Sequence, residues 1–529
     1  MPACTLTIQS PGGSRVLSFT PPVSLYRLLA DNGVPVDMPC GGRQRCLKCK
    51  AAVSGGVSPM SEREAALLTA EEKAAGLRFA CMAELTGDAV LRLSGGAAGD
   101  AILTEGAMPV FTRAPWGRQW GAAVDIGTTT VAAYLYRLAD GALLATQSEK
   151  NPQAVFGADV VSRLEQAMNG KSPELAAAIR ECLSRLLAGL CGQAGLPMDA
   201  IDSVVLTGNT AMLYLLTERH PASIVAAPFA MDCGFGQFVA PQALALPLSP
   251  DCRVYLPACL SAYVGADITT ALLAAGFYRE GRVPAGPPRL LVDIGTNGEM
   301  ALAADGRLLC CSTAAGPALE GAGIHQGMMA RTGAIYRVRL EGLTMVCDVL
   351  GGGEAQGICG SGLVDAVAAL CEAGVIQDTG LIDEESHAFT AYVEECDGQP
   401  AFRLPGTAVR LTQKDIRAVQ LAKSAICAGM RTLIAEAGLQ AEAIAELVVA
   451  GGFGSRIDPV SAERIGLFPA GFAAKARAVG NAAGAGAAMV LLSDPIRREA
   501  EGMPAAVRTV ELSSHPGFMD AYIDGMYFA

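Results

Sequence analysis

The residues whose types and spacing are best suited to chemistry are cysteines near the N-terminus. Three share a short loop, with five residues between the first two and two between the next pair, and a fourth follows after 31 intervening residues. They are Cys40, Cys46, Cys49 and Cys81. Three thiolates on a tight loop plus one distant thiolate can hold an iron–sulfur cluster. A zinc site or metal-free cysteines are the alternatives, but zinc sites usually contain a second short cysteine pair.

The spacing of this loop resembles that of ferredoxins. The plant type has four residues between its first two cysteines, and the five found here resemble the adrenodoxin-like variant of that fold. The resemblance implies a [2Fe–2S] cluster. Residues 5–8 and 15–19 alternate apolar and polar positions like a hairpin, residues 23–32 have helical spacing, and residues 88–93 are typical of a strand. We therefore predict a β-grasp ferredoxin domain (α+β) over residues 1–94.

Basic residues crowd the same loop. They are Arg43, Arg45, Lys48 and Lys50. One interpretation is that they offset the negative charge of the cluster. The other is that they form a docking face for an acidic redox partner.

A second set of candidate residues lies in two copies of Asp-Ile-Gly-Thr, each after an apolar strand pattern. The copies begin at Asp125 and Asp293, which indicates a duplicated unit. Each turn can aim backbone N–H groups and threonine hydroxyls at phosphate oxygens, and each aspartate can hold Mg²⁺ through water or orient an attacking water. We predict Asp125 and Asp293 as catalytic residues. The predicted nucleotide-binding residues of the two turns are Gly127, Thr128, Thr129, Thr130, Gly295, Thr296, Asn297, Gly298 and Glu299.

The order of the later segments resembles the ASKHA superfamily of actin, sugar kinases and Hsp70-type ATPases. Residues 264–275 and 479–492 are small-residue helices, which match the family's two connecting helices. Between them, residues 447–454 form a buried strand ending in glycines, which matches the adenosine-binding turn at Gly451, Gly452 and Gly454. The resemblance implies ATP, Mg²⁺ and a two-lobed, ribonuclease H-like fold.

These segments give an α/β multidomain chain. We predict a flexible Gly/Ala/Pro-rich linker over residues 95–120, a first ATPase lobe over 121–285, a second lobe over 286–500 and a C-terminal tail over 501–529. In the first lobe, Asn209 follows a strand and is predicted to face the nucleotide. Glu320 lies in a glycine-flanked turn and is expected to be solvated.

A ferredoxin domain ahead of an ASKHA ATPase resembles the reductive activators of corrinoid proteins. The resemblance extends over nearly the whole chain and includes the segments 293–299, 358–362 and 515–528. It implies ATP-dependent delivery of one low-potential electron to the Co(II) corrinoid of a methyltransferase system, which restores Co(I). The implied partners are that corrinoid protein and a low-potential donor (ferredoxin, flavodoxin or flavoprotein), and known members imply a homodimer.

Ser361 has two interpretations in this framework. It lies in a glycine turn that opens a helix, where a serine usually caps the helix end. The alternative is that its hydroxyl reaches the partner's cobalt.

Composition excludes several other classes. The net charge of −12 argues against nucleic acid. No uninterrupted apolar stretch approaches the roughly 18 residues of a membrane span, and the N-terminus lacks a signal-peptide layout. Seventeen cysteines without such a signal predict a reducing cytoplasm.

Three other functions remain open from the sequence. The ATPase half could belong to an ATP-dependent amidohydrolase, although such an enzyme has no use for a ferredoxin domain. Dehydratase activators share the ATPase fold, but their [4Fe–4S] cluster bridges a dimer. A nucleotide-binding redox module without corrinoid reductase activity is the third.

Overall fold

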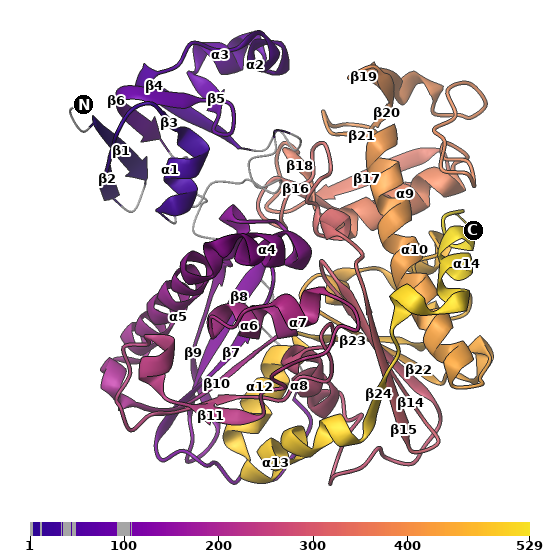
Figure 1. Cartoon of the computed structure of the whole chain (residues 1–529). Helices are drawn as coiled ribbons and strands as arrows, with labels where there is room; N and C mark the ends of the chain where they lie inside the picture. Colours follow the sequence, from indigo (N-terminus) through magenta and orange to yellow (C-terminus); the bar gives the residue numbers. More distant parts are fainter. Residues whose placement is uncertain are drawn as a thin grey trace.

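The structure is a computed structural model that describes residues 4–10, 13–32, 34, 44, 49–92, 106 and 108–528. It contains three six-stranded sheets, one in an N-terminal domain and one in each of two lobes, and a smaller α/β region on the second lobe (Figure 1). No helix in these described ranges is both long enough and apolar enough to cross a bilayer.

The N-terminal sheet has the strand order β2-β1-β6-β4-β5, and β3 pairs with β6. β1 pairs antiparallel with β2 and parallel with β6. The last strand of this domain therefore extends the β1–β2 hairpin. The predicted hairpin and final strand are confirmed, although β6 begins four residues earlier than expected. The elements are β1 (Cys4–Ser10), β2 (Gly13–Phe19), β3 (Val23–Ser24), α1 (Leu25–Asp31), β4 (Lys50–Val57), α2 (Glu62–Leu67), α3 (Ala70–Ala74), β5 (Leu77–Phe79) and β6 (Glu84–Arg92).

A buried ion pair joins α2 to β5 in this domain. Arg78 donates to both carboxylate oxygens of Glu64, at 2.9 and 2.7 Å, and both side chains are almost fully buried. Glu64 also accepts a hydrogen bond from the backbone N–H of Phe79 at 2.9 Å. Because Phe79 lies two residues before Cys81, this pair fixes the strand that leads to a predicted cluster ligand.

The first lobe is built on a six-stranded sheet with the order β11-β12-β10-β7-β8-β9. β7, β8 and β9 form an antiparallel meander, and β10 and β12 add to β7 in parallel. The strands are β7 (Trp120–Ile126), β8 (Thr130–Arg137), β9 (Ala142–Lys150), β10 (Ile201–Gly208), β11 (Gln237–Val239) and β12 (Arg253–Leu256). The helices are α4 (Val160–Gln166), α5 (Ser172–Ala194), α6 (Thr210–Leu216), α7 (Ala222–Val225) and α8 (Ala266–Ala274).

The second lobe repeats this topology, with the order β23-β22-β13-β14-β15-β24. Again three strands form a meander, and β22 and β23 add in parallel. The predicted duplication is therefore confirmed. The strands are β13 (Arg289–Ile294), β14 (Gly298–Ala304), β15 (Arg307–Thr313), β22 (Glu446–Ala450), β23 (Ala476–Gly480) and β24 (Val507–Thr509). The helices are α10 (Gln413–Glu436), α11 (Pro459–Arg464), α12 (Ala482–Leu492), α13 (Asp494–Gly502) and α14 (Pro516–Asp524).

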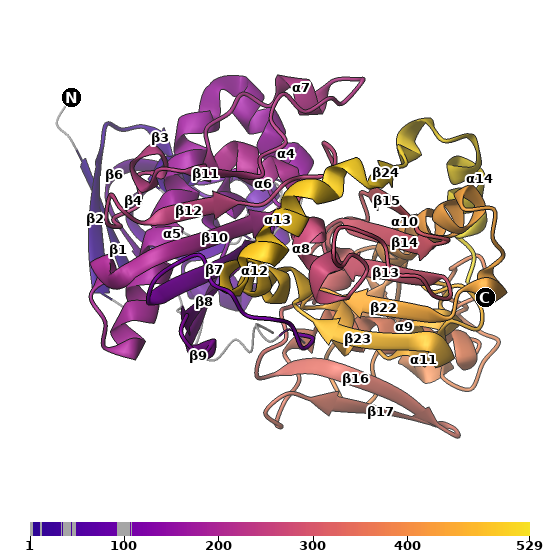
Figure 2. The same cartoon turned by 90° about the horizontal axis from the view of Figure 1, so that it is seen from below.

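Helices α8 and α12 lie between the sheets of the two lobes, as the view from below shows (Figure 2). Every residue of α12 is buried. A Cβ atom at Gly486 of α12 would lie 1.8 Å from the backbone oxygen of Thr270 in α8. The prediction that small residues allow two helices to cross closely is confirmed.

Smaller elements complete the second lobe. They are β16 (Ala334–Glu341), β17 (Thr344–Val349), β18 (Gly357–Ile358), α9 (Gly360–Glu372), β19 (Val393–Cys396), β20 (Gln399–Arg403) and β21 (Arg410–Thr412). The C-terminal residues are part of this lobe, because β24 pairs with β15 and α14 packs on α10.

The last part of the expected linker differs from the prediction. Trp116 donates its indole N–H to the backbone oxygen of Val490 at 2.9 Å, and Ala114 exchanges backbone hydrogen bonds with Leu492 and Asp494. This segment is therefore packed against α12 and α13 rather than forming a flexible joint. Burying the apolar surface of Trp116 against the helix is more favourable in free energy than leaving it exposed on a flexible segment.

Candidate functional site

The predicted phosphate turns face one another across a cavity of about 260 Å³ between the lobes. The cavity is lined by Asp125 and Asp293, by most other predicted nucleotide residues and by several that were not predicted. The predicted residues at the wall are Gly127, Thr128, Thr129, Thr130, Asn209, Gly295, Thr296, Asn297, Glu299, Gly451 and Gly452. Gly298 and Gly454 are not at the wall: Gly298 packs toward Ile426 of α10, and Gly454 packs toward Ile294.

Carboxylates from both lobes gather at the floor of the cavity. Burial raises the pKa of Asp125 to about 6, of Asp293 to about 7 and of Asp267 to about 8, and repulsion from neighbouring carboxylates adds to the last two. Asn481, the N-cap of α12, donates to Asp125 at 2.9 Å and lowers its pKa somewhat. Uncompensated negative charge of this kind attracts a cation.

Glu299 adds a further observation to this group. Its Oε1 atom is buried and has no hydrogen-bond partner among the described residues. Burial, followed by repulsion from Asp267, raises its pKa well above the usual value. Buried polar atoms are normally paired, so an unpaired carboxylate oxygen among three aspartates fits a hard divalent cation or its water ligands.

Glu320 corrects the sequence-based expectation of a solvated loop. Its Oε2 atom accepts hydrogen bonds from Thr129 at 3.0 Å and from Thr296 at 2.8 Å, and the two hydroxyls lie 3.3 Å apart. Burial raises the pKa of Glu320. One carboxylate thus joins the phosphate turns of the two lobes. Gly316 and Gly321, both with φ of 78°, allow the sharp turns that aim it inward.

Two side chains hold the first phosphate turn from below. Asn209 caps α6 by accepting from the N–H of Met212, and its amide donates to Thr128 Oγ1 at 3.1 Å. Arg163 is fully buried and donates to the backbone oxygen of Thr128 at 2.7 Å. Burial lowers the pKa of Arg163 to about 9. Sequence reasoning found Asn209 at its strand end but missed Arg163, which looks like an ordinary helical arginine.

The glycines after β22 bring backbone close to the floor of the cavity. Gly451 has φ of 94°, and a Cβ atom there would lie 2.6 Å from Oδ1 of Asp293. Phe453 and Arg456 extend this side of the cavity wall. The turn therefore leaves room beside a catalytic candidate that a larger residue would fill.

The capping role expected for Ser361 is wrong. Cys359 occupies the N-cap position of α9, without a side-chain cap bond, and Ser361 lies inside the first turn. The Ser361 hydroxyl donates to the backbone oxygen of Tyr336 at 2.9 Å. Cys359 and Ser361 both line the cavity. The helix begins earlier than expected because Gly360, which packs against the Leu319 oxygen and Phe453, already has helical geometry.

Half of the predicted cluster site lies in the described part of the chain. The Sγ atoms of Cys49 and Cys81 are 3.2 Å apart, and the backbone N–H of Ala80 donates to the Cys49 oxygen. Two thiols this close can bind one metal centre. Cys40 and Cys46 lie outside the described residues, as do Arg43, Arg45 and Lys48. Lys50 is described, and it pairs with Glu72 at 2.6 Å.

Helix α1 of the N-terminal domain contacts the first lobe near this sulfur pair. The Tyr26 N–H donates to the Ala80 oxygen, and the Tyr26 hydroxyl lies 3.5 Å from the Val155 oxygen, which it can reach as a long hydrogen bond. Tyr26 thus lies between the segment that carries Cys81 and the first lobe.

Comparison with known proteins agrees with this architecture. Residues 288–529 match a family model described as the C-terminal domain of RACo, the ASKHA domain, and residues 120–280 match the RACo middle region. The expected ASKHA fold is therefore confirmed.

Relatives match over most of the chain. The corrinoid activation enzyme RamQ of Eubacterium limosum is 36% identical over 426 residues, which cover 77% of this chain and 70% of the relative. The [Co(II) methylated amine-specific corrinoid protein] reductase of Methanosarcina barkeri is 27% identical over 394 residues, or 68% of each chain. The solved structure of a reductive activator for corrinoid, iron-sulfur protein has a TM-score of 0.70 and 27% identity, and the match covers 99% of this chain and 98% of that one. This chain belongs to the family of reductive activators of corrinoid proteins.

Proposed function

We propose that this protein is an ATP-dependent reductive activator of a methyltransferase corrinoid protein. It passes one electron from a [2Fe–2S] cluster on Cys40, Cys46, Cys49 and Cys81 to Co(II), which becomes Co(I) while the cluster is oxidised by one electron. The observation that carries the proposal is the joining, in one chain, of the Cys49–Cys81 sulfur pair to a nucleotide-type cavity between duplicated lobes. The relatives named as corrinoid activators support it.

The reaction needs an energy input, which explains the ATPase half. A plant-type [2Fe–2S] centre lies near −400 mV, and each 100 mV by which this falls short costs about 2.3 kcal/mol per electron. ATP binding and hydrolysis would not change the electron count. They would drive the conformational step that binds, reshapes or releases the partner.

Residues of both lobes would hold the nucleotide. The backbone and hydroxyls of the 127–130 and 295–297 turns would contact phosphate oxygens, and the glycines at 451 and 452 would admit adenosine. Asp125, Asp293 and Glu299 would hold Mg²⁺, which neutralises charge that develops on phosphoryl oxygens. Asp125 and Asp293 would also orient the attacking water.

Glu320 would link nucleotide binding to movement of the lobes. It binds a threonine from each lobe at once, so the observed contact belongs to a closed cleft. Opening the lobes must break at least one of these hydrogen bonds. Phosphate oxygens that compete for the same hydroxyls would therefore couple the state of the nucleotide to lobe closure, and lobe closure to partner release.

The proposal also covers the electron donor, the oligomeric state and the cellular compartment. A low-potential ferredoxin, flavodoxin or flavoprotein would load the cluster, and the active form would be a homodimer. The many cysteines are compatible with a reducing cytoplasm.

Conversion of Co(II) to Co(I) tests the function directly. Anaerobic, cluster-loaded protein is mixed with a chemical reductant and a purified corrinoid protein, and the visible spectrum is followed with and without Mg·ATP. We expect Co(I) to form in the presence of ATP and far more slowly without it. A redox module without reductase activity, or an amidohydrolase, would give no ATP-dependent Co(I) and no ATP turnover stimulated by the corrinoid protein.

A further inference from the structure

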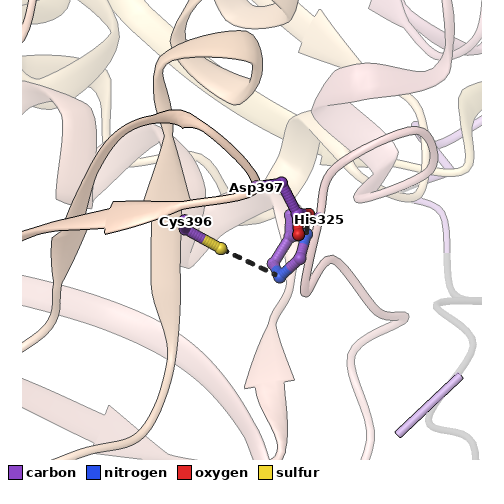
Figure 3. A group of neighbouring side chains, drawn as sticks. All are labelled: His325, Cys396 and Asp397. Carbon is purple, nitrogen blue, oxygen red and sulfur yellow. Dashed lines mark hydrogen bonds and ion pairs between the residues drawn. The ribbon is translucent and has the colours of Figure 1, made fainter. Parts of the chain in front are cut away.

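A group of metal-type ligands lies outside the cavity and the cluster site. His325, Cys396 and Asp397 each offer one ligand atom, and these atoms lie within 4.8 Å of one another. His325 Nε2 is 3.9 Å from Cys396 Sγ, and His325 Nδ1 is 3.9 Å from Asp397 Oδ2 (Figure 3). The three side chains come from two segments that are 71 residues apart in the sequence.

The hairpin that carries Cys396 and Asp397 is geometrically fixed. Cys396 is the last residue of β19 and pairs with Gln399, so the connection has two residues, Asp397 and Gly398. Their φ values are 54° and 73°, as a tight two-residue hairpin requires. The turn places the carboxylate of Asp397 at the tip, directly beside the thiol at the strand end.

The loop that carries His325 is fixed to the same small sheet. The His325 N–H donates to Oδ1 of Asp415 at 2.8 Å, while Oδ2 of Asp415 forms a capping box with Thr412. The neighbouring Gln326 accepts from the backbone N–H of Arg410 at 2.7 Å. Both ligand-bearing segments are thus anchored to β21 and the start of α10. Binding an ion would therefore not require either segment to become ordered first.

We propose that His325, Cys396 and Asp397 bind a divalent ion of the zinc class, with water as the fourth ligand. Imidazole, thiolate and carboxylate are the donors that zinc prefers. For ordinary Zn–S and Zn–N bonds, a tetrahedral site separates sulfur from nitrogen by roughly 3.6 Å, against 3.9 Å here. A single imidazole nitrogen coordinates the ion, and one ligand atom of each residue lies within 4.8 Å of the other two, so small side-chain rotations bring all three donors onto one ion. All three residues are at least partly accessible to solvent, so an ion can enter.

The position of His325 indicates what the ion would do. In the sequence it follows Glu320, which joins the phosphate turns, and precedes Met329 and Ala330, which also line the cavity. An ion held by His325 and the β19–β20 hairpin would tie this wall of the cavity to the small sheet of the second lobe. The expected role is structural, because no ligand of the group lines the cavity itself.

Zinc binding is tested on intact, cluster-loaded protein. One equivalent of Zn²⁺ is added, competed with a chromophoric chelator, and both zinc and iron are counted after gel filtration. We expect one tightly bound zinc per chain and unchanged iron. His325→Ala/Cys396→Ser should weaken zinc binding by about a hundredfold or more, since two of three protein ligands are lost.

A matched control removes the same residue types elsewhere. His220→Ala/Cys347→Ser changes an exposed histidine in the first lobe and a partly buried cysteine in β17, and it should bind zinc like the wild type. Hydrogen exchange gives a second measurement: zinc should slow exchange in residues 321–330 and 393–399 of the wild type and not of the ligand variant. Equal zinc affinity in the two double variants, or zinc that displaces iron without protecting these segments, would overturn the proposal.

Discussion

The carboxylates around the cavity show how single residues combine into a site. Asp125 and Asp293 were predictable because each stands in a local pattern, a strand followed by Gly-Thr. Asp267, Glu320 and Arg163 were not, because each resembles an ordinary helix or loop residue in its own segment. Only the fold brings them to the phosphate turns. Local chemistry was therefore predictable from the sequence, and chemistry assembled from distant segments was not.

Removing either catalytic candidate should reduce ATP turnover strongly. Asp125→Ala and Asp293→Ala each delete a buried carboxylate placed to hold metal or water, and such groups typically contribute about a hundredfold or more in rate. Turnover is measured with and without corrinoid protein, and circular dichroism checks folding. Asp140→Ala, at an exposed turn residue of the first lobe, should turn over ATP normally. Near-wild-type turnover by both folded variants would refute the assignment.

The raised pKa values also predict how metal and pH act together. Unfolded aspartates titrate near 3.8, whereas Asp125, Asp293 and Asp267 titrate at about 6, 7 and 8 in the folded chain. Between these limits the folded state binds more protons than the unfolded state, so these groups lower stability as pH rises. Their penalty is absent below the unfolded pKa and complete above the folded values.

Mg·nucleotide should therefore raise the melting temperature more at about pH 8, where the carboxylates are charged, than at about pH 6, where most hold protons. Differential scanning fluorimetry with a non-hydrolysable ATP analogue, with and without Mg²⁺, measures this difference. The comparison with and without Mg²⁺ removes contributions from other titrating groups. An equal Mg²⁺-dependent increase at both pH values would contradict a metal held by these residues.

At the scale of elements, the sequence predicted the two repeated sheets better than the edge strand and the segment that pack onto them. Alternation and the two Asp-Ile-Gly-Thr turns define the meanders, and alanine and glycine composition defines α8 and α12. The strand β24 and the packing of Trp116 were missed, because short edge strands and isolated aromatic contacts carry no periodic signal. The first turn of α9 was misplaced for a similar reason, since glycine there looked like a loop.

The crossing of α8 and α12 predicts a substitution with a clear sign. Gly486→Ala would place a methyl group 1.8 Å from a backbone oxygen that cannot rotate away, and it should cost about 1–3 kcal/mol through forced separation of the helices. In α5, a Cβ atom added at Gly192 would have no neighbouring atom within 4 Å. Gly192→Ala should therefore stabilise the folded protein by up to about 1 kcal/mol through its higher helix propensity.

Urea unfolding of both glycine variants measures these effects, with ATP turnover as a second measurement. Because α8 and α12 connect the lobes, Gly486→Ala should also slow turnover, whereas Gly192→Ala should not. Similar stability changes in the two variants would mean that the close crossing has no special importance.

At the scale of the whole molecule, the basic residues that the sequence places between the predicted cluster cysteines predict how a partner docks. Arg43→Glu/Arg45→Glu should slow electron transfer from an acidic donor, or to the corrinoid protein, because oppositely charged faces accelerate encounter. The effect should be about tenfold or more at low ionic strength and should shrink as salt is added. ATP affinity should not change.

Arg15→Glu/Lys73→Glu is the matched control, since it makes the same charge change at exposed positions of β2 and α3. Stopped-flow rates over a series of salt concentrations compare the two proteins. If both variants slow transfer equally, net charge is sufficient and the loop is not a docking face. If neither does, the basic residues only balance the charge of the cluster.

The Glu320 bridge has a thermodynamic consequence for the partner. A group bound to both lobes links two equilibria, nucleotide binding and lobe opening, and such linkage acts equally in both directions. The factor by which bound ATP changes the affinity for the corrinoid protein must equal the factor by which the bound corrinoid protein changes the affinity for ATP. Because Thr129 and Thr296 meet on one carboxylate, Glu320→Ala should bring that factor toward one, so that ATP and the corrinoid protein would bind independently.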